Sequence, residues 1–336
     1  MLRRVQNHRM TSRPGSPNGA TLLAFLGVAL FGGLNTIAVK VTVAELAPLW
    51  GAGTRFLAAG MIFAGLTLAT RRPFPSGRGL GGAMLYGAVG YAGAFGLLYP
   101  ALREIPAGTA GVVIAMAPLA TYVLAVAQGQ ERFQLMSLVG GLIAVAGVAI
   151  VFIDQLSAAV PLGALILALG GMLFLSEAGV IAKWIPRSDP IATNAVAMTS
   201  AGVLGLAASV ALGEPMTIPT QPGTWLAIGY IVVLGSVLLF GLYLFGLERW
   251  SASGMAYSTL LLPFVSVTAA TFLAGETFTP AFAVGGLVMV VGVYVGAFLA
   301  HRPRRSTATA TPECLPMADC ADAVPAALRS GGSVPR

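Results

Sequence analysis

The sequence predicts an all-α integral membrane protein whose ten transmembrane helices form two inverted five-helix repeats. Composition is the first reason: 57% of the 336 residues are hydrophobic and 9% are charged, whereas soluble domains carry roughly 25% charged residues. The second is a series of uninterrupted apolar runs near twenty residues, the length of a membrane-crossing helix rather than of an alternating barrel strand. The third is an internal match between the two halves of the chain.

The expected helices follow the apolar runs in order and end where proline, glycine or charge interrupts them. They lie near residues 21–40, 47–70, 80–102, 108–127, 134–153, 161–182, 190–212, 223–247, 253–273 and 280–300. The interruptions, in chain order, begin at Glu45, Arg71, Arg103, Glu131, Asp154, Pro186, Glu214, Glu248, Glu276 and His301. The first run is longer than a signal-peptide core and no small-residue cleavage site follows, so we expect it to stay in the membrane.

The basic residues indicate how the helices are oriented. With ten spans, both tails and one set of loops carry nearly all the lysines and arginines, and the other loops carry only Lys40 and Arg103. The positive-inside rule then places both termini in the cytoplasm. The net charge of +7 is explained in the same way, because the basic residues are scattered and form no nucleic-acid-binding patch. The tails, residues 1–18 and 302–336, are polar, and we expect them to be disordered.

An internal repeat supports the inverted arrangement. Moving the chain by 145 residues aligns Pro118 with Pro263, Glu131 with Glu276 and Phe133 with Phe278. The first two helices of each half align with a shift of 142 or 143. We therefore expect repeats over 19–155 and 156–301, and because five is odd, the second enters the membrane from the opposite side. Secondary transporters use this construction and hold substrate near the midplane.

Residues 31–56, "FGGLNTIAVKVTVAELAPLWGAGTRF", resemble the opening of the EamA domain of the drug/metabolite transporter superfamily. The matching positions are Phe31-Gly32, Asn35, Lys40, Pro48 and Arg55-Phe56. The similarity covers about residues 21–300, although the second half has Ala197 where the first has Arg55. It implies a ten-helix carrier of the cytoplasmic (inner) membrane, of a kind that exports amino acids, other metabolites or drugs, and it does not name the substrate.

Polar and aromatic residues within the spans are the candidates for lining a substrate cavity. They are Asn35, Tyr91, Phe95, Tyr99, Glu177, Ser236, Phe240 and Tyr243. Tyr91, Phe95 and Tyr99 follow at i, i+4 and i+8, which places them on one helix face. Aromatic residues near helix ends also anchor proteins at the membrane interface, and that alternative stays open for Tyr99 and Tyr243.

Glu177 is the only acidic residue well inside an expected span. It is a candidate for binding a substrate amine or for accepting the proton in a proton-coupled cycle. Two other interpretations stay open: an ion pair with Lys183, six residues further on, or a hydrated position near the cytoplasmic end.

Three basic residues are interpreted mainly as structural. Arg55 lies roughly 10 Å into its helix, where a charge is costly and is a functional hypothesis by default. We favour a role in capping carbonyls or in reaching the surface with its guanidinium. Lys40 and Lys183 are expected at equivalent helix C-termini, where a cation complements the helix dipole.

Two prolines are candidates for gate hinges. Pro118 and Pro263 occupy equivalent positions, each after a charged turn and a run of small residues. Proline removes a helical hydrogen bond, which frees the carbonyl of Ile114 or Thr259. A static kink is the alternative.

The same residues argue against an enzyme. The two histidines, His8 and His301, lie outside or at the edge of the spans, and Cys314 and Cys320 lie in the tail. The sequence therefore offers no catalytic set, metal site, cofactor motif or ATP-binding loop. We expect a secondary active transporter of small molecules in the lipid bilayer, with protons as a candidate coupling ion and a passive channel as the alternative. The choice between monomer and homodimer stays open.

Overall fold

The computed structural model describes residues 17–105, 107–153, 160–186, 188–274 and 280–299. Nearly all of both tails lies outside these ranges, and so do Asp154 and Glu276. Every regular element among the described residues is helical, which confirms the predicted all-α class.

Helical segments occupy all ten expected ranges. In the first half they are α2 (Gly19–Glu45), α3 (Pro48–Ala69), α4 (Arg78–Tyr86), η1 (Gly87–Gly93), α5 (Ala94–Glu104), α6 (Ala107–Ala115), α7 (Ala117–Ala127) and α8 (Leu135–Val151). In the second half they are α9 (Leu162–Trp184), α10 (Pro190–Ala211), α11 (Pro222–Val232), η3 (Val233–Leu238), α12 (Leu239–Arg249), α13 (Ala252–Ala256), η4 (Tyr257–Leu260), α14 (Leu261–Ala274), α15 (Pro280–Val293) and η5 (Tyr294–Leu299). η1, η3 and η5 are π-helical and η4 is a 3-10 turn.

Eight of the helical stretches are long and apolar enough to cross a membrane among the residues that the structure describes. The stretches over 78–104 and 222–249 count as single helices because α-helix and π-helix run on without a break. α8 is apolar but shorter, with 17 residues. The ninth expected range, 253–273, contains three short segments, α13, η4 and α14.

The first helix is longer than the sequence predicts. α2 continues through Val41, Thr42 and Val43 to Glu45, and Leu46 is its extended C-cap. The helix ends there because Pro48 begins α3 and the residue before a proline is restricted to extended conformations; Ala47 has φ −64° and ψ 144°. The prediction that Lys40 lies at a helix C-terminus is therefore wrong: it lies five residues before the end of α2 and is exposed.

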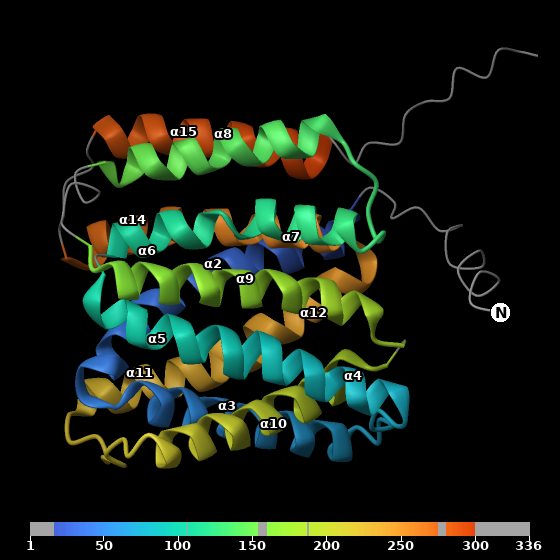
Figure 1. Cartoon of the computed structure of the whole chain (residues 1–336), viewed down its shortest axis with the longest axis vertical. Coiled ribbons are helices and arrows are strands. Elements are labelled where there is room, and N and C mark those ends of the chain that lie inside the picture. The colour runs from blue at the N-terminus through green and yellow to red at the C-terminus, as the bar shows by residue number, and fades with distance from the viewer. Residues whose placement is uncertain (1–16, 106, 154–159, 187, 275–279, 300–336) are drawn as a thin grey trace, which may run out of the picture. The chain divides into compact units, whose positions relative to one another are not determined.

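Two close helix pairs form the outer layers of the helical unit (Figure 1). α3 packs along α10, α8 packs along α15, and the remaining helices lie between these pairs. Both contacts depend on glycine. A Cβ on Gly60 would lie 2.6 Å from the backbone N of Thr199, and one on Gly147 would lie 2.4 Å from the backbone N of Met289. Backbones can approach this closely only where a side chain is absent.

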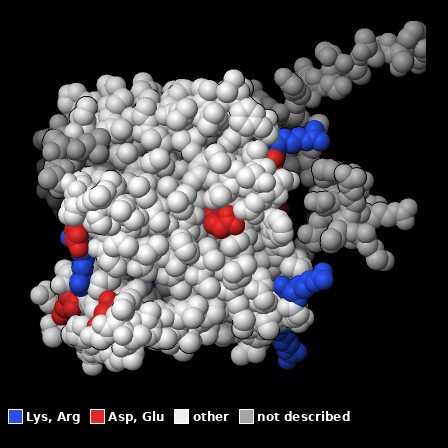
Figure 2. Space-filling model, in the orientation of Figure 1, with Lys and Arg blue, Asp and Glu red and all other residues white. Residues whose placement is uncertain are grey.

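The surface suits a lipid environment between the helix ends. Figure 2 shows that charged side chains on the visible face lie mainly along its two edges, where helices begin and end, apart from one acidic patch. Many large apolar side chains are exposed, among them Leu23, Met61, Leu142, Ile166 and Leu226. In water such a surface would be a large unpartnered apolar area, whereas lipid tails solvate it.

Candidate functional site

Arg55 joins four helical segments inside the bundle. It lies two turns after Pro48 begins α3, and only 2% of its surface is exposed. Its guanidinium donates from Nε to Ser236 Oγ (2.8 Å), from Nη1 to the Tyr99 hydroxyl (2.8 Å), and from Nη2 to Asn35 Oδ1 (3.2 Å) and Gly235 O (2.8 Å). These partners come from η3, α5 and α2. Three of the expected cavity residues, Asn35, Tyr99 and Ser236, thus meet at one side chain.

The π-helical segment η3 supplies two of the four acceptors. A π-helix bonds i to i+5 and so changes the direction in which carbonyls and side chains point. The Ser236 hydroxyl donates to the carbonyl of Ile231, five residues earlier, at 2.7 Å, which leaves its oxygen free to accept from Arg55. A Cβ on Gly235 would lie 2.2 Å from Asn35 Oδ1, so only glycine allows Asn35 to reach the guanidinium.

An aromatic cluster packs beside the guanidinium. Phe56 stacks on Tyr91 with ring centroids 5.2 Å apart, and Phe240 meets the Tyr91 ring edge-on at 4.8 Å. Phe95 contacts Phe56, Tyr99 and Phe240 at 5.1–6.3 Å. The expected cavity residues Tyr91, Phe95, Tyr99 and Phe240 are therefore in one cluster, in which Tyr91, Tyr99 and Phe240 are buried against other rings.

Tyr91 also belongs to a buried polar chain. Its hydroxyl donates to Asn194 Oδ1 (2.9 Å) and bonds the Tyr86 hydroxyl (2.9 Å). The Asn194 amide nitrogen donates to the carbonyl of Phe240 (3.1 Å). This polar chain connects α4, η1, α10 and α12, so a movement of any one of these helices would change its hydrogen bonds.

The charge of Arg55 is not neutralised within the described residues. All four of its acceptors are uncharged, and no described Asp or Glu pairs with it; the described ion pairs Arg72–Asp189 and Arg249–Glu248 involve other residues. The rings of Phe56 and Phe95 lie 5.1 and 5.4 Å from the guanidinium carbon and offer cation–π contacts. Because a guanidinium stays protonated in proteins, the site keeps a positive charge.

A cavity of about 160 Å³ adjoins this cation. It is formed by α3, by α11 and by the end of α2, and its lining consists of Leu46, Gly51, Thr54, Arg55, Ala58, Ile228, Ile231 and Val232. Arg55 is the only charged residue among them. The other polar side chain of the lining is Thr54, whose hydroxyl donates to the carbonyl of Trp50 at 2.8 Å. The remaining lining residues are aliphatic or glycine.

Glu177 lies away from the Arg55 contacts, on α9. It is seven residues before the end of that helix, roughly 10 Å at 1.5 Å per residue. Both carboxylate oxygens accept from the Gln128 side-chain amide, at 2.9 and 2.8 Å. Lys183 instead donates to the carbonyl of Leu247 at the end of α12, so the two residues do not form the ion pair considered from the sequence. Tyr243 faces the same helix: a Cβ on Gly179 would lie 2.8 Å from its hydroxyl.

The two prolines follow breaks in their helices. Between α6 and α7 the chain turns at Met116, so Pro118 lies in the first turn of α7. Pro263 is the third residue of α14, just after the 3-10 turn η4. In both cases the irregularity precedes the proline, which agrees with the loss of a backbone hydrogen bond there. The hinge function of these sites stays a prediction.

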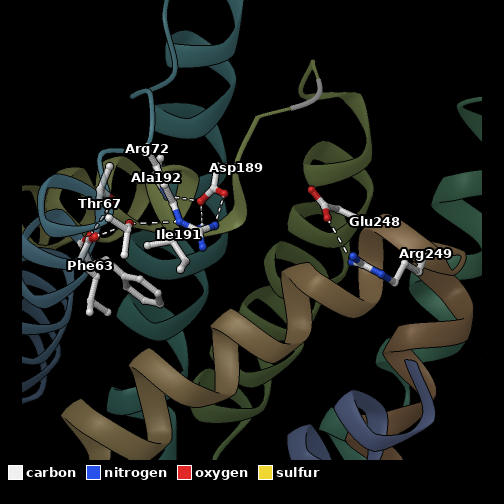
Figure 3. Close-up of polar contacts among 10 residues, drawn as sticks. Phe63, Thr67, Arg72, Asp189, Ile191, Ala192, Glu248 and Arg249 are labelled. Carbon is white, nitrogen blue, oxygen red and sulfur yellow. Dashed lines mark hydrogen bonds and ion pairs between the residues drawn. The ribbon is translucent and has the colours of Figure 1, made fainter. Parts of the chain in front are cut away.

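Polar contacts fix both ends of the α3–α10 pair. Asp189 pairs with Arg72, which follows α3, and also accepts from the backbone N of Ile191 and Ala192 at the start of α10 (Figure 3). At the opposite end, the Glu214 carboxylate accepts from the backbone N of Leu49 (3.2 Å) and Trp50 (2.9 Å). A carboxylate at a helix N-terminus satisfies unpaired donors and complements the dipole. Arg55 therefore projects from a helix held at both ends.

The comparison with known proteins decides the family. The EamA-like transporter family matches residues 19–153 and again 162–297, which together make up most of the chain. The chain belongs to the EamA-like transporter family. It is therefore a transporter of the drug/metabolite transporter superfamily and not an enzyme, and the eight long apolar helices among its described residues indicate a multi-pass membrane protein.

Relatives of this EamA transporter are named as a transporter or an efflux pump. The "Uncharacterized inner membrane transporter YedA" of Escherichia coli strain K12 is 28% identical over 280 residues, which cover 82% of this chain and 91% of the relative. A "Probable amino-acid metabolite efflux pump" of Salmonella typhimurium is 28% identical over 295 residues, 84% of this chain and 96% of the relative. A crystal structure with 20% identity matches the fold with a TM-score of 0.69, over 87% of this chain and the whole of that one.

Some residues of the transporter's site were missed from the sequence. Tyr86, Asn194 and Gly235 were not singled out, although the structure places them in the polar chain or beside Arg55. Asn194 is a polar residue inside an apolar span and could have been found by the criterion that selected Asn35. Gly235 carries no such signal, because 43 glycines make each of them individually uninformative.

Proposed function

We propose that this EamA transporter is a secondary active exporter of small metabolites that works by alternating access in the inner membrane. Its ten helical ranges form two inverted five-helix repeats, over 19–155 and 156–301, with both termini in the cytoplasm. The two family matches, the asymmetric distribution of basic residues and the relatives named as inner membrane transporters and efflux pumps support this proposal.

One observation supports the repeat and the mechanism together. The π-helical segments η1 and η3 are related by the same shift of 145 residues that aligns the two halves. Each contributes to the polar centre of the bundle: η1 carries Tyr91, and η3 carries Gly235 and Ser236. π-Helical turns occur often at functional sites, and a matched pair places one irregular helix from each half at the same centre.

In this proposal the substrate binds beside Arg55, whose acceptors Asn35, Tyr99 and Ser236 lie where these irregular helices meet, and the two halves alternately open to either side. The helix breaks at Pro118 and Pro263 act as the hinges of the two gates. Glu177, between the polar centre and the end of α9 and with Gln128 as its partner, exchanges a proton with the cytoplasm in this proposal. Amino acids, related compounds and drugs are the candidate substrates.

The test is an efflux screen followed by reconstitution. Cells that express the chain are challenged with toxic amino-acid analogues, other metabolites and drugs, and a protecting compound is then measured in proteoliposomes. We expect saturable flux that is stimulated by the same solute on the opposite side. A flux that rises linearly with concentration and shows no such stimulation would indicate the passive channel instead.

A further inference from the structure

We propose that the cavity beside Arg55 binds a short aliphatic monocarboxylate, held by an ion pair between its carboxylate and the Arg55 guanidinium. The inference rests on the proposed transport function and names the substrate class. It assigns Arg55, which the sequence suggested to be structural, to direct contact with the transported molecule.

The first step of the argument is the free binding capacity of the guanidinium. Arginine has five N–H donors, and four of them bond Ser236, Tyr99, Asn35 and Gly235. The fifth, on Nη1, has no acceptor among the described residues. A carboxylate is the acceptor that matches a guanidinium best in charge and shape, and bonds between these ions are stronger than bonds to the neutral acceptors present now.

The second step is the geometry. The same neutral acceptors hold the guanidinium in place from α2, α5 and η3, and α3 is fixed at both ends. Arg55 is therefore positioned before any ligand arrives. A preorganised donor loses little conformational freedom on binding, which favours affinity. Arg55 is itself part of the cavity wall, and the proposed ion pair requires its free Nη1 donor to face the cavity.

The third step concerns the rest of the ligand. Leu46, Ala58, Ile228, Ile231 and Val232 present aliphatic surface, which suits a hydrocarbon body. A dry apolar cavity of about 150 Å³ can hold benzene, which has six heavy atoms as butyrate does, so the volume of about 160 Å³ admits a ligand of that size.

The lining contains no carboxylate to pair with an ammonium group. The nearest acidic residue in sequence, Glu45, is not part of the wall, and its carboxylate accepts from Thr220. An amine in this cavity would meet the positive charge of Arg55 without compensation. The cavity therefore favours a simple carboxylate over a free amino acid with the same carbon chain.

The experiment compares three ligands with the same four-carbon skeleton. The thermal unfolding midpoint of the purified full chain in detergent is titrated with butyrate, n-butylamine and 2-aminobutyrate at constant ionic strength. We expect butyrate to raise the midpoint in a saturable way and n-butylamine to have no such effect, with 2-aminobutyrate clearly weaker than butyrate. Equal effects of the three ligands would overturn the inference.

Two variants test the site. Arg55→Gln removes the charge, and we expect it to weaken butyrate about tenfold or more. Ala58→Leu keeps the guanidinium but fills the cavity, and it decides the question if Arg55→Gln does not fold; we expect the same loss. The control is Ala69→Leu, an exposed position at the other end of α3, which should bind butyrate like the wild type. Unchanged butyrate binding in Ala58→Leu would contradict the proposal.

The outcome also separates this inference from the proposed function. If proteoliposomes show saturable counterflow of a solute from the screen and butyrate neither binds nor competes, the carboxylate site is wrong and the transport function stands. If butyrate binds through Arg55 and no tested solute, butyrate included, shows saturable counterflow, the site stands and the proposed exporter fails.

Discussion

Arg55 shows what a single charged residue needs in order to remain inside a helical bundle. Placing an arginine at the centre of a membrane helix costs about 2.5–3.5 kcal/mol on insertion scales. A hydrogen bond to a charged group contributes about 1.5–3 kcal/mol. The four bonds from the guanidinium are thus enough to offset its burial without an anionic partner. They satisfy the donors and leave the net charge in place.

The sequence identified most of these residues but could not connect them. Arg55, Asn35, Tyr99 and Ser236 were each selected as unusual within an apolar span. That Arg55 donates to Ser236, 181 residues away, depends on helix packing, which local patterns do not encode. Local patterns therefore interpret Arg55 as structural and three of its four acceptors as cavity residues, although they form one site.

Asn35→Asp would give Arg55 the missing counter-ion. It places a carboxylate where Asn35 Oδ1 now accepts at 3.2 Å. We expect the unfolding midpoint without ligand to rise, because a neutral acceptor becomes charged, and butyrate binding to weaken, because the cation is already neutralised. Thermal unfolding with and without butyrate measures both effects.

The matched control is Asn194→Asp, which adds a carboxylate at a buried site and removes the donor to the Phe240 carbonyl. We expect it to lower the midpoint. If Asn35→Asp lowers the midpoint by as much as Asn194→Asp does, the charge of Arg55 is compensated in some other way.

Gly235→Ala tests the close approach that assembles the site. The new Cβ would lie 2.2 Å from Asn35 Oδ1, so Asn35 must leave the guanidinium or η3 must shift. We expect destabilisation of about 1–3 kcal/mol, typical of overpacking, together with weaker butyrate binding. Gly229→Ala is the control, since nothing lies within 4 Å of its Cβ position on the adjoining α11. Thermal unfolding of both variants in detergent makes the comparison, and equal midpoints would refute the predicted clash.

At the scale of elements, the positions of the helices were predictable, whereas their exact ends and their irregularities were not. Apolar runs and their interruptions placed helical segments in all ten expected ranges, because the bilayer demands about twenty apolar residues whatever the tertiary packing. The π-helical segments η1 and η3 were not predicted. A π-turn is unfavourable in isolation and persists where tertiary contacts stabilise it. Here these contacts are the hydrogen bonds from Arg55 to η3 and from η1 to Asn194.

The breaks before Pro118 and Pro263 lead to a prediction about rates. In the proposed function each break is a hinge, so restoring helical hydrogen bonding there should slow the transition between openings and leave the fold intact. We expect Pro118→Ala and Pro263→Ala to reduce the maximal counterflow rate in proteoliposomes severalfold, with unfolding midpoints equal to or above that of the wild type.

The control for these variants is Pro222→Ala. Pro222 occupies the first turn of α11 and follows the non-helical residues 214–221, so it interrupts no helical hydrogen bond, whereas Pro118 and Pro263 directly follow helical turns. Its substitution should leave the rate unchanged. Normal rates in both Pro118→Ala and Pro263→Ala would favour static kinks that only shape the packing.

At the scale of the whole described unit, the polar side chains separate into a centre and two ends. The centre contains Arg55 and its neutral partners, and the ends contain carboxylates that cap helices or pair with arginines, such as Glu214 and Asp189. Glu177 belongs to neither group. Its partner Gln128 is neutral, so the carboxylate could exchange a proton without breaking an ion pair.

Glu177→Gln tests whether this residue couples transport to protons. If the Glu177 carboxylate carries the proton, the glutamine amide that replaces it cannot do so. We therefore expect loss of transport driven by a pH gradient. Counterflow without a gradient requires no net proton movement, and we expect it to persist. Both kinds of transport are measured in proteoliposomes with the solute found in the screen.

The control is Glu248→Gln. Glu248 is an exposed carboxylate near the end of α12, and its ion pair with Arg249 lies on the surface. Normal gradient-driven transport by Glu177→Gln would exclude the proton-relay function, and equal loss in both variants would show only a general sensitivity to acidic charge.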